Sequence, residues 1–169
     1  AVAYADWLSS QTGQTYRLPS EAELEYVERG GTQTIFPWGK DDNGGCTFAN
    51  GADETPFADG GLLNPRAACK DGHVFTAPVG SHSPNWFGIN DSIGNVWEWA
   101  ADCVHSTYNG APEDGSAWVN ADGSPCPAHI LRGGSWADAP VALRPAHRNW
   151  VYASDRRDYY GFRVARDVI

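Results

Sequence analysis

The sequence contains no methionine among its 169 residues, and no apolar run is long enough to cross a membrane. No secretory signal is visible at its start, so we interpret it as a mature or trimmed chain. Basic residues are scarce, with 12 Lys and Arg against 21 Asp and Glu, which leaves a net charge of -9. A nucleic-acid partner requires a basic face that meets the phosphates. We therefore expect a protein or small-molecule ligand, with no nucleic acid and no membrane span.

Two common metal-binding patterns are also missing. Neither Cys-x-x-Cys nor His-x-x-x-His spacing occurs, which argues against a zinc knuckle and against a histidine pair on one helix. The cysteines and histidines are Cys46, Cys69, Cys103, Cys126, His73, His82, His105, His129 and His147.

Four cysteines permit three disulfide pairings. We favour local pairing, Cys46 with Cys69 and Cys103 with Cys126, which would cross-link two loop-rich regions. This pairing favours an extracellular, periplasmic or cell-surface location, because disulfides persist in oxidising compartments. The alternative is four reduced, buried thiols in a cytoplasmic protein.

Aromatic residues and turn formers are plentiful instead. The chain has 8 Trp, 19 Gly and 11 Pro. This mixture is typical of long loops held together by aromatic packing rather than of a helix bundle. The length suits one domain with a hydrophobic core.

Two helices are expected near the start. Tyr4, Trp7 and Leu8 have the spacing of one apolar face, which predicts a helix over roughly the first ten residues. The second helix should begin after Ser20, whose side chain can cap the N–H of Glu23 while the Glu23 side chain reaches back. We expect this second helix to be purely structural.

Strands are expected at residues 76–80, 96–99, 131–136 and 161–167. The second strand has one aromatic face, and its Glu98 stands between two tryptophans, so this carboxylate needs an arginine or a calcium ion as partner. The third strand ends in a Gly-Gly turn. Alternation in the last strand predicts Phe162 inward and Arg163 outward.

The segment between the Gly-Gly turn and the closing strand shows neither a helix period nor a strand period. It is rich in Trp, Tyr and Arg, which argues against disorder. Long irregular segments in compact domains often carry function. We therefore expect residues 136–160 to form a functional surface.

Residues 31–82 place many oxygen-bearing side chains on glycine-rich loops. Calcium is bound by several such oxygens on loops that bend around it. Composition alone leaves a calcium site and a solvated acidic loop as equal alternatives.

Five motifs occur in order along the chain: Arg17-Leu18-Pro19-Ser20-Glu21-Ala22-Glu23, Phe36-Pro37-Trp38-Gly39, Gly94-Asn95-Val96-Trp97-Glu98-Trp99, Arg132-Gly133-Gly134-Ser135-Trp136 and Gly161-Phe162-Arg163. With them the chain resembles the formylglycine-generating-enzyme-like (sulfatase-modifying-factor) family over nearly its whole length. The resemblance implies an α+β, C-type-lectin-like fold with two helices, small antiparallel sheets and mostly irregular loops. Family members usually carry further strands before the first helix, so we expect one domain over residues 1–169 that lacks them.

The resemblance also implies two calcium sites built from side-chain and backbone oxygens. The positions that match the first site are Asn50, Gly51, Asp71 and His73. The positions that match the second site are Asp91, Gly94, Val96 and Glu98. An oxygen-bearing side chain is present wherever the family uses one, which favours calcium as a cofactor.

The copper site of the family does not carry over. Formylglycine-generating enzymes hold copper(I) with two thiolates shortly after Gly-Gly-Ser, because a soft ion needs soft ligands. Counted from Ser135, those two positions hold Asp138 and Leu143, and no cysteine follows Cys126. We expect no copper and no formylglycine-generating activity.

Three functions are compatible with this resemblance. The first is a calcium-stabilised binding module, similar to the variable proteins of diversity-generating retroelements. The second is a non-copper enzyme of the same superfamily, sulfoxide-synthase-like or pyoverdine-maturation-like, in which Asp138 and His147 could form an acid–base pair. The third is an appendage of a larger receptor or kinase. We favour binding over catalysis.

Aromatic, charged and amide side chains between the last two motifs are the expected ligand contacts. They are Trp136, Asp138, Arg144, His147, Asn149, Trp150, Tyr152, Asp155, Arg157 and Tyr159. For Arg148, Arg163 and Trp136 we favour a structural role, with the arginines paired to core acids and the indole packed inside.

Overall fold

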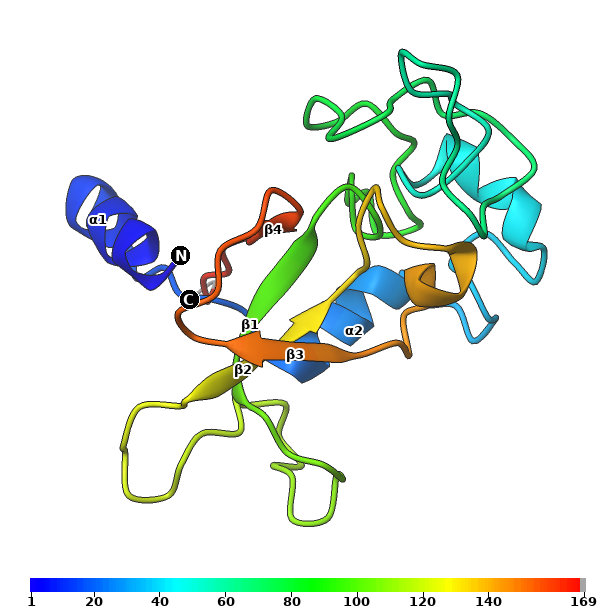
Figure 1. Ribbon diagram of the computed structural model, residues 1–169. Helices are drawn as coiled ribbons and strands as arrows, with labels where there is room; N and C mark the ends of the chain where they lie inside the picture. Colours follow the sequence, from blue (N-terminus) through cyan, green and yellow to red (C-terminus); the bar gives the residue numbers. More distant parts are fainter. Residues whose placement is uncertain (168–169) are drawn as a thin grey trace.

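Long loops make up most of the molecule, and two helices with one small sheet organise them (Figure 1). The structure is a computed structural model that describes residues 1–167. The helices are α1 (Val2–Thr12) and α2 (Glu21–Arg29), with two short 3-10 helices, η1 (Asp42–Thr47) and η2 (Pro140–Leu143). The strands are β1 (Trp97–Cys103), β2 (Ala128–Arg132), β3 (Asn149–Tyr152) and β4 (Tyr160–Gly161). Among the described residues, no helix is long and apolar enough to cross a membrane.

The sheet has the strand order β3-β2-β1-β4. β2 pairs with β1 and with β3 in antiparallel register, whereas β4 joins β1 in parallel. The expected α+β fold is confirmed, but the expectation of purely antiparallel pairing is wrong for β4. The connection from β3 crosses to the opposite edge of the sheet before β4 begins, so β4 runs in the same direction as β1 (Figure 1).

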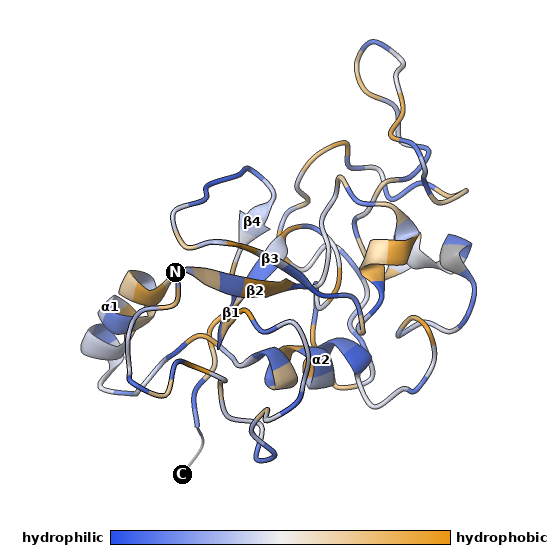
Figure 2. Cartoon of the chain, turned by 60° about the horizontal axis from the view of Figure 1, so that its bottom comes forward, coloured by the Kyte–Doolittle hydropathy of each residue, from blue (hydrophilic) through white to orange (hydrophobic). Residues whose placement is uncertain are grey.

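Helix α2 covers one face of the sheet and contacts β1 and β2 (Figure 2). Leu24 of this helix packs with Ala100 and Ile130, and all three are almost completely buried. The helix begins as predicted: the Ser20 hydroxyl accepts the Glu23 N–H, and the Glu23 carboxylate accepts the Ser20 N–H. This capping box satisfies donors at the first turn that the helix itself leaves unpaired.

The opposite face of the sheet is covered by the segment that follows β2. Trp97, Leu131 and Val151 from three strands form a core cluster with Ala142 of η2, and Trp99 packs against it. Successive side chains of a strand point to opposite faces, so Trp97 and Trp99 lie on the same side of β1. The aromatic face predicted for this strand is confirmed.

Helix α1 confirms the helix predicted at the start, but its large apolar residues are not the buried ones. Tyr4 and Trp7 are about half exposed, and Ala5 is buried. The Tyr4 ring contacts Phe162, with ring centroids 5.4 Å apart. Figure 1 shows α1 beside the β4 edge of the sheet rather than on its core.

Two strand predictions are wrong. Residues 76–80 form no strand, and the backbone of Ala77 instead donates to and accepts from the Asn95 side-chain amide. The closing strand is limited to β4, and its alternation is inverted: Arg163 points inward to Glu98, while Phe162 is partly exposed. A carboxylate in the core requires a hydrogen-bonded partner, and this requirement outweighs burial of one apolar ring.

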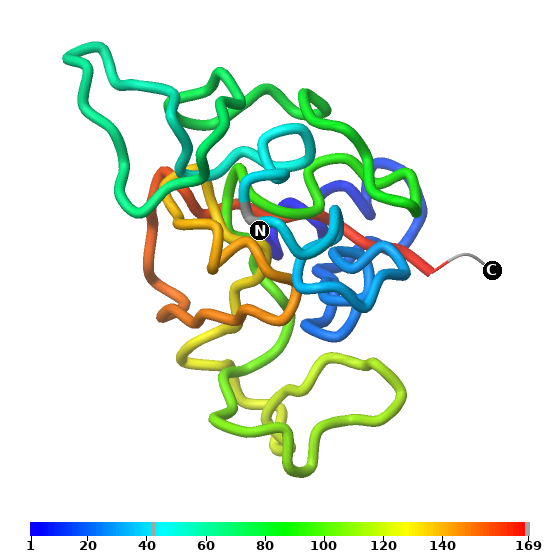
Figure 3. Tube along the Cα trace, turned by 90° about the vertical axis from the view of Figure 1, so that its right-hand side faces the viewer, coloured from blue at the N-terminus to red at the C-terminus, as the bar shows by residue number. Residues whose placement is uncertain are grey.

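Two disulfides cross-link the irregular segments, and their pairing is the one predicted from the sequence. Cys46–Cys69 joins η1 to a loop before the sheet, and Cys103–Cys126 closes the long connection between β1 and β2. Figure 3 shows the loops of residues 31–95 gathered on one side of the sheet, with the β1–β2 connection projecting at the opposite end.

Replacing Cys103 and Cys126 together by alanine is expected to lower the free energy of unfolding by about 3 kcal/mol. The two cysteines are 23 residues apart, and their bond restricts the unfolded chain. Urea unfolding followed by circular dichroism measures the change. The Cys46 and Cys69 pair has the same separation and serves as the matched comparison. A loss below about 1 kcal/mol for both pairs would contradict this account.

Candidate functional site

The candidate site is the turn after β2, where Gly133 and Gly134 adopt positive φ angles of 91° and 75°. Residues other than glycine adopt this conformation at a cost. Space is limited as well, because a Cβ on Gly134 would lie 2.7 Å from a methyl carbon of Leu143. The Gly94 N–H donates to the Gly133 carbonyl at 2.9 Å. The glycines thus let the turn pack closely between the start of β1 and η2.

Asp138, at the first of the two thiolate positions, is held by hydrogen bonds. Its Oδ2 accepts the Trp97 indole N–H at 2.8 Å and the Ser135 backbone N–H at 3.1 Å. The Ser135 hydroxyl donates to the same oxygen. The carboxylate therefore fixes the Trp97 ring beneath the Gly-Gly-Ser turn.

Leu143, at the second thiolate position, is a core residue. It is buried in a cluster with Ala49 and Ile93. Gly51 approaches it so closely that a Cβ there would lie 2.5 Å from a Leu143 methyl carbon. All four cysteines of the chain are in disulfides. No thiolate is therefore available near the turn.

His147 lies against the same indole as Asp138. Its ring centroid is 5.7 Å from that of Trp97. Burial lowers the pKa of His147, the Arg144 charge lowers it further, and the Asp138 charge opposes both. The structure thus brings Asp138 and His147 to one tryptophan, which the sequence did not show, although no hydrogen bond joins their side chains in the described part of the chain.

Trp150 and Tyr152 form an exposed aromatic pair on β3, a strand that the sequence did not predict. They are 50% and 58% exposed, and their rings meet edge to face with centroids 5.6 Å apart. Val151 between them points into the core cluster, so the pair lies on the other side of the strand, toward α2. β3 is an end strand with one buried residue, which explains why its sequence lacks a clear period.

The ten expected ligand contacts do not form a single surface. Four of them are half-buried beside the Trp97 cluster: Trp136, Asp138, His147 and Tyr159. Three are on β3: Asn149, Trp150 and Tyr152. Asp155 and Arg157 lie in the β3–β4 connection, and Arg144 follows η2. The most exposed aromatic side chains of the set are on β3.

Trp136 has the packing environment expected of a structural residue. It is half-buried, and its ring centroid lies 5.0 Å from that of Phe75 and 6.5 Å from that of Tyr159. Its indole N–H is buried without a hydrogen-bond partner.

Arg148 and Arg163 are paired with acids, as the structural interpretation predicted. Arg148 donates to both carboxylate oxygens of Glu21, each at 2.8 Å. Arg163 donates to both oxygens of Glu98, at 2.5 and 2.6 Å. Such two-point contacts fix the orientation of the guanidinium group and also neutralise the charge of the carboxylate.

Arg132 is a third paired arginine, and sequence reasoning missed it. It is fully buried and donates to Glu25 of α2 at 2.5 Å. It also donates to the carbonyls of Pro145 and His147, at 2.6 and 3.0 Å. The spacing of Glu21 and Glu25, which places both on one face of α2, was the available signal.

Glu28 of α2 is buried, and in the described part of the chain neither of its carboxylate oxygens accepts a hydrogen bond. Burial raises the pKa of Glu28 well above its ordinary value, against the opposing charge of Arg132. The protonated form is therefore favoured, which avoids an unpaired charge in the core. Glu28 lies one helical turn after Leu24 on the buried face of α2, so the helix period was the available signal.

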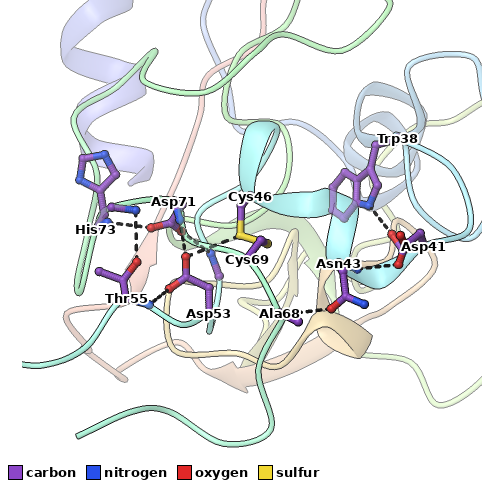
Figure 4. Close-up of a disulfide and its surroundings, with 12 residues drawn as sticks. Trp38, Asp41, Asn43, Cys46, Asp53, Thr55, Ala68, Cys69, Asp71 and His73 are labelled. Atoms are coloured by element: carbon purple, nitrogen blue, oxygen red, sulfur yellow. Dashed lines mark hydrogen bonds between the residues drawn. A yellow bond between two sulfur atoms is a disulfide. The ribbon is translucent and has the colours of Figure 1, made fainter. Parts of the chain in front are cut away.

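The first set of expected calcium ligands lies beside the Cys46–Cys69 disulfide, where Asp71 and His73 are drawn in Figure 4. Asn50 is buried, and its side-chain oxygen has no hydrogen-bond partner among residues 1–167. Asp71 accepts the backbone N–H groups of His73 at 2.7 Å and Gly51 at 3.3 Å. Burial raises the pKa of Asp71 to about 6, and the nearby Asp53 carboxylate adds to the shift.

These features of the first set fit a calcium ion. A divalent cation would satisfy the Asn50 oxygen and favour the charged form of Asp71. Residues 1–167 contain no group of three His, Cys, Asp or Glu side chains placed to hold a metal. A cation here would therefore depend on amide and backbone oxygens as well as on one carboxylate.

The second set fits calcium less well. Both Glu98 oxygens already accept hydrogen bonds from Arg163, and the Gly94 carbonyl accepts the Val96 N–H at 2.8 Å. Asp91 keeps one buried oxygen without a hydrogen bond. A cation in this set would compete with the guanidinium group.

Comparison with known proteins gives the class of this domain. A family model described as a sulfatase-modifying factor enzyme 1-like domain matches residues 1–168, and the chain belongs to that family. The chain is 34% identical to the formylglycine-generating enzyme of Mycobacterium tuberculosis, with 100% of this chain and 55% of the relative covered. It is 29% identical to the hercynine oxygenase of the same organism, with 99% and 35% covered.

Two solved structures share the fold. PvdO from Pseudomonas aeruginosa matches with 43% identity and a TM-score of 0.81, over 98% of this chain and 58% of that chain. Treponema denticola variable protein 1 matches with 26% identity and a TM-score of 0.70, over 90% and 48%. The chain spans about half the length of the curated relatives it matches. These relatives confirm the formylglycine-generating-enzyme-like fold, and they differ too much in name to indicate one function.

Replacing Arg163 by alanine is expected to lower the free energy of unfolding by about 3 kcal/mol, because Glu98 would stay buried without its partner. The double variant Glu98→Gln, Arg163→Met should recover part of this loss, since no unpaired charge is left. Chemical denaturation of the three proteins measures the difference. Equal losses in the single and double variants would show that the cost comes from packing rather than from charge.

Proposed function

We propose that this chain is a calcium-stabilised binding module of the formylglycine-generating-enzyme-like family, with Trp150 and Tyr152 at the centre of its recognition surface. The exposed aromatic pair carries the proposal. Two large, stiff side chains on a strand offer contact area at a low cost in side-chain entropy. The likeness to a Treponema denticola variable protein supports a binding role.

Formylglycine production is not part of the proposal. Copper(I) would need two thiolates after the Gly-Gly-Ser turn, and Asp138 and Leu143 occupy those positions. Asp138 is committed to Trp97 and Ser135, and Leu143 fills the core.

A second candidate function is a non-copper enzyme of the same superfamily. The placement of Asp138 and His147 around Trp97 favours it, as does the similarity to a hercynine oxygenase. A neutral imidazole with a lowered pKa can accept a proton near pH 7. Close relatives discriminate the two candidates: variation at Trp150 and Tyr152 supports binding, whereas invariance of Asp138 and His147 supports catalysis.

The two disulfides support an extracytoplasmic setting for the module. We propose that it acts within a larger receptor, with a protein or small molecule as its ligand.

Replacing Asp71 by asparagine is expected to abolish the response of the protein to calcium. The raised pKa of Asp71 means that, without calcium, stability is lost as pH rises through about 6. At pH 7 in chelator, the asparagine variant should therefore melt no lower than the wild type. Calcium should raise the melting temperature of the wild type only. Thermal unfolding in chelator and in millimolar calcium measures both effects, and an unchanged wild-type melting temperature would exclude the calcium site.

The double variant Trp150→Ala, Tyr152→Ala is expected to lose at least about tenfold in affinity for ligands found on peptide or glycan arrays. Trp86→Ala is the matched control, because Trp86 is 84% exposed on a different loop. Affinities are measured by surface plasmon resonance. Equal binding by the double variant and the control would place the recognition surface elsewhere.

A further inference from the structure

A cleft of about 470 Å³ lies between α1, the β4 edge of the sheet and the β3–β4 connection, which Figures 1 and 2 show side by side. None of its lining residues belongs to the Gly-Gly-Ser turn or to the exposed aromatic pair. Trp99, His129 and Tyr160 form an aromatic wall. The Trp99 ring centroid is 5.9 Å from that of His129 and 6.3 Å from that of Tyr160, and both contacts are edge to face. Such a wall suits a flat aromatic ring.

Two adjacent arginines line the same cleft. Arg156 is exposed and donates to the backbone carbonyls of Ala153 at 3.1 Å and Asp155 at 2.7 Å. Arg157 is exposed as well, and residues 1–167 provide no salt bridge to either guanidinium group. In a chain with a net charge of -9, guanidinium donors without a carboxylate partner are available to an anion from outside.

The charge that this cleft accepts is limited. Asp155 also lines it, so two positive groups face one negative group. A singly charged carboxylate is balanced by this set, whereas a doubly charged phosphate group would be repelled by Asp155. The forked donors of a guanidinium group match the planar carboxylate.

His129 sets the orientation of the ligand. Its Nδ1 lies 3.1 Å from the Asp102 carbonyl oxygen, and a carbonyl oxygen only accepts, so Nδ1 carries the proton. Nδ1 is thus engaged with that carbonyl, and the arginine donors of the cleft belong to Arg156 and Arg157. The carboxylate is therefore directed to the arginine side of the cleft, and the aromatic ring to the Trp99 side.

We propose that this cleft binds a small aromatic carboxylate, with its ring against Trp99 and Tyr160 and its carboxylate on Arg157. The proposal extends the proposed binding function, because Asp155 and Arg157 belong to the same segment. It depends neither on calcium nor on Trp150 and Tyr152.

Isothermal titration calorimetry with three probes tests the proposal. The carboxylate 3-phenylpropionate should bind, 2-phenylethylamine should not, and 3-cyclohexylpropionate should bind more weakly because it lacks the π-face. Arg157→Gln should weaken 3-phenylpropionate binding about tenfold, and Arg157→Lys less, since the charge remains without the fork. Arg166→Gln is the matched control: Arg166 is exposed outside the cleft, donates to Gln14 and carries the same charge.

Each outcome has a defined meaning. No binding of 3-phenylpropionate, equal binding of the amine, or equal losses in Arg157→Gln and Arg166→Gln would overturn the proposal. The variant Trp150→Ala, Tyr152→Ala should bind 3-phenylpropionate as the wild type does. Suppose that this variant no longer binds the ligands found on the arrays, while the wild type does not bind 3-phenylpropionate. The proposed binding module is then supported, and the cleft proposal is wrong.

Discussion

The fully buried guanidinium group of Arg132 is the contact on which the arrangement of the fold depends. It stands at the end of β2, meets Glu25 of α2 on one side, and donates to the carbonyls of Pro145 and His147 on the other. A buried charge tolerates few other arrangements, because each lost partner leaves a costly unpaired group. The helix, the strand and the segment after the Gly-Gly turn are therefore fixed relative to one another by one side chain.

The chain has the fold of its family, and the two positions at which the resemblance implies copper ligands hold Asp138 and Leu143. Leu143 packs against Gly51 and Gly134, two residues whose lack of a side chain makes room for it. Asp138 occupies the other position by accepting the Trp97 indole N–H. Both replacements are thus integrated into the packing and hydrogen bonding of the core. The Gly-Gly turn is held between the start of β1 and η2 by these contacts.

Local interactions were predictable from the sequence, and those that join distant segments were not. The Ser20 capping box and both disulfides depend on short spacings, and they were predicted correctly. The inward direction of Arg163 depends on Glu98, which lies 65 residues earlier, so alternation alone gave the wrong answer. Strand β3 was missed because it forms only by pairing with β2. The expected ligand contacts lie far apart for the same reason. Their segment first covers one face of the sheet, then forms its edge strand β3, and then forms the loop between β3 and β4.

The charge state of Glu28 has a consequence for how the protein responds to ionic strength. The buried Arg132 and the partly buried Arg148 and Arg163 are paired with Glu25, Glu21 and Glu98, and a protonated Glu28 adds no charge to these three pairs. Mobile ions screen exposed charges and hardly reach buried pairs. Salt should therefore relieve the mutual repulsion of the acidic exterior without weakening the ion pairs inside. A protein with this distribution of charge keeps its architecture in dilute and in saline surroundings alike.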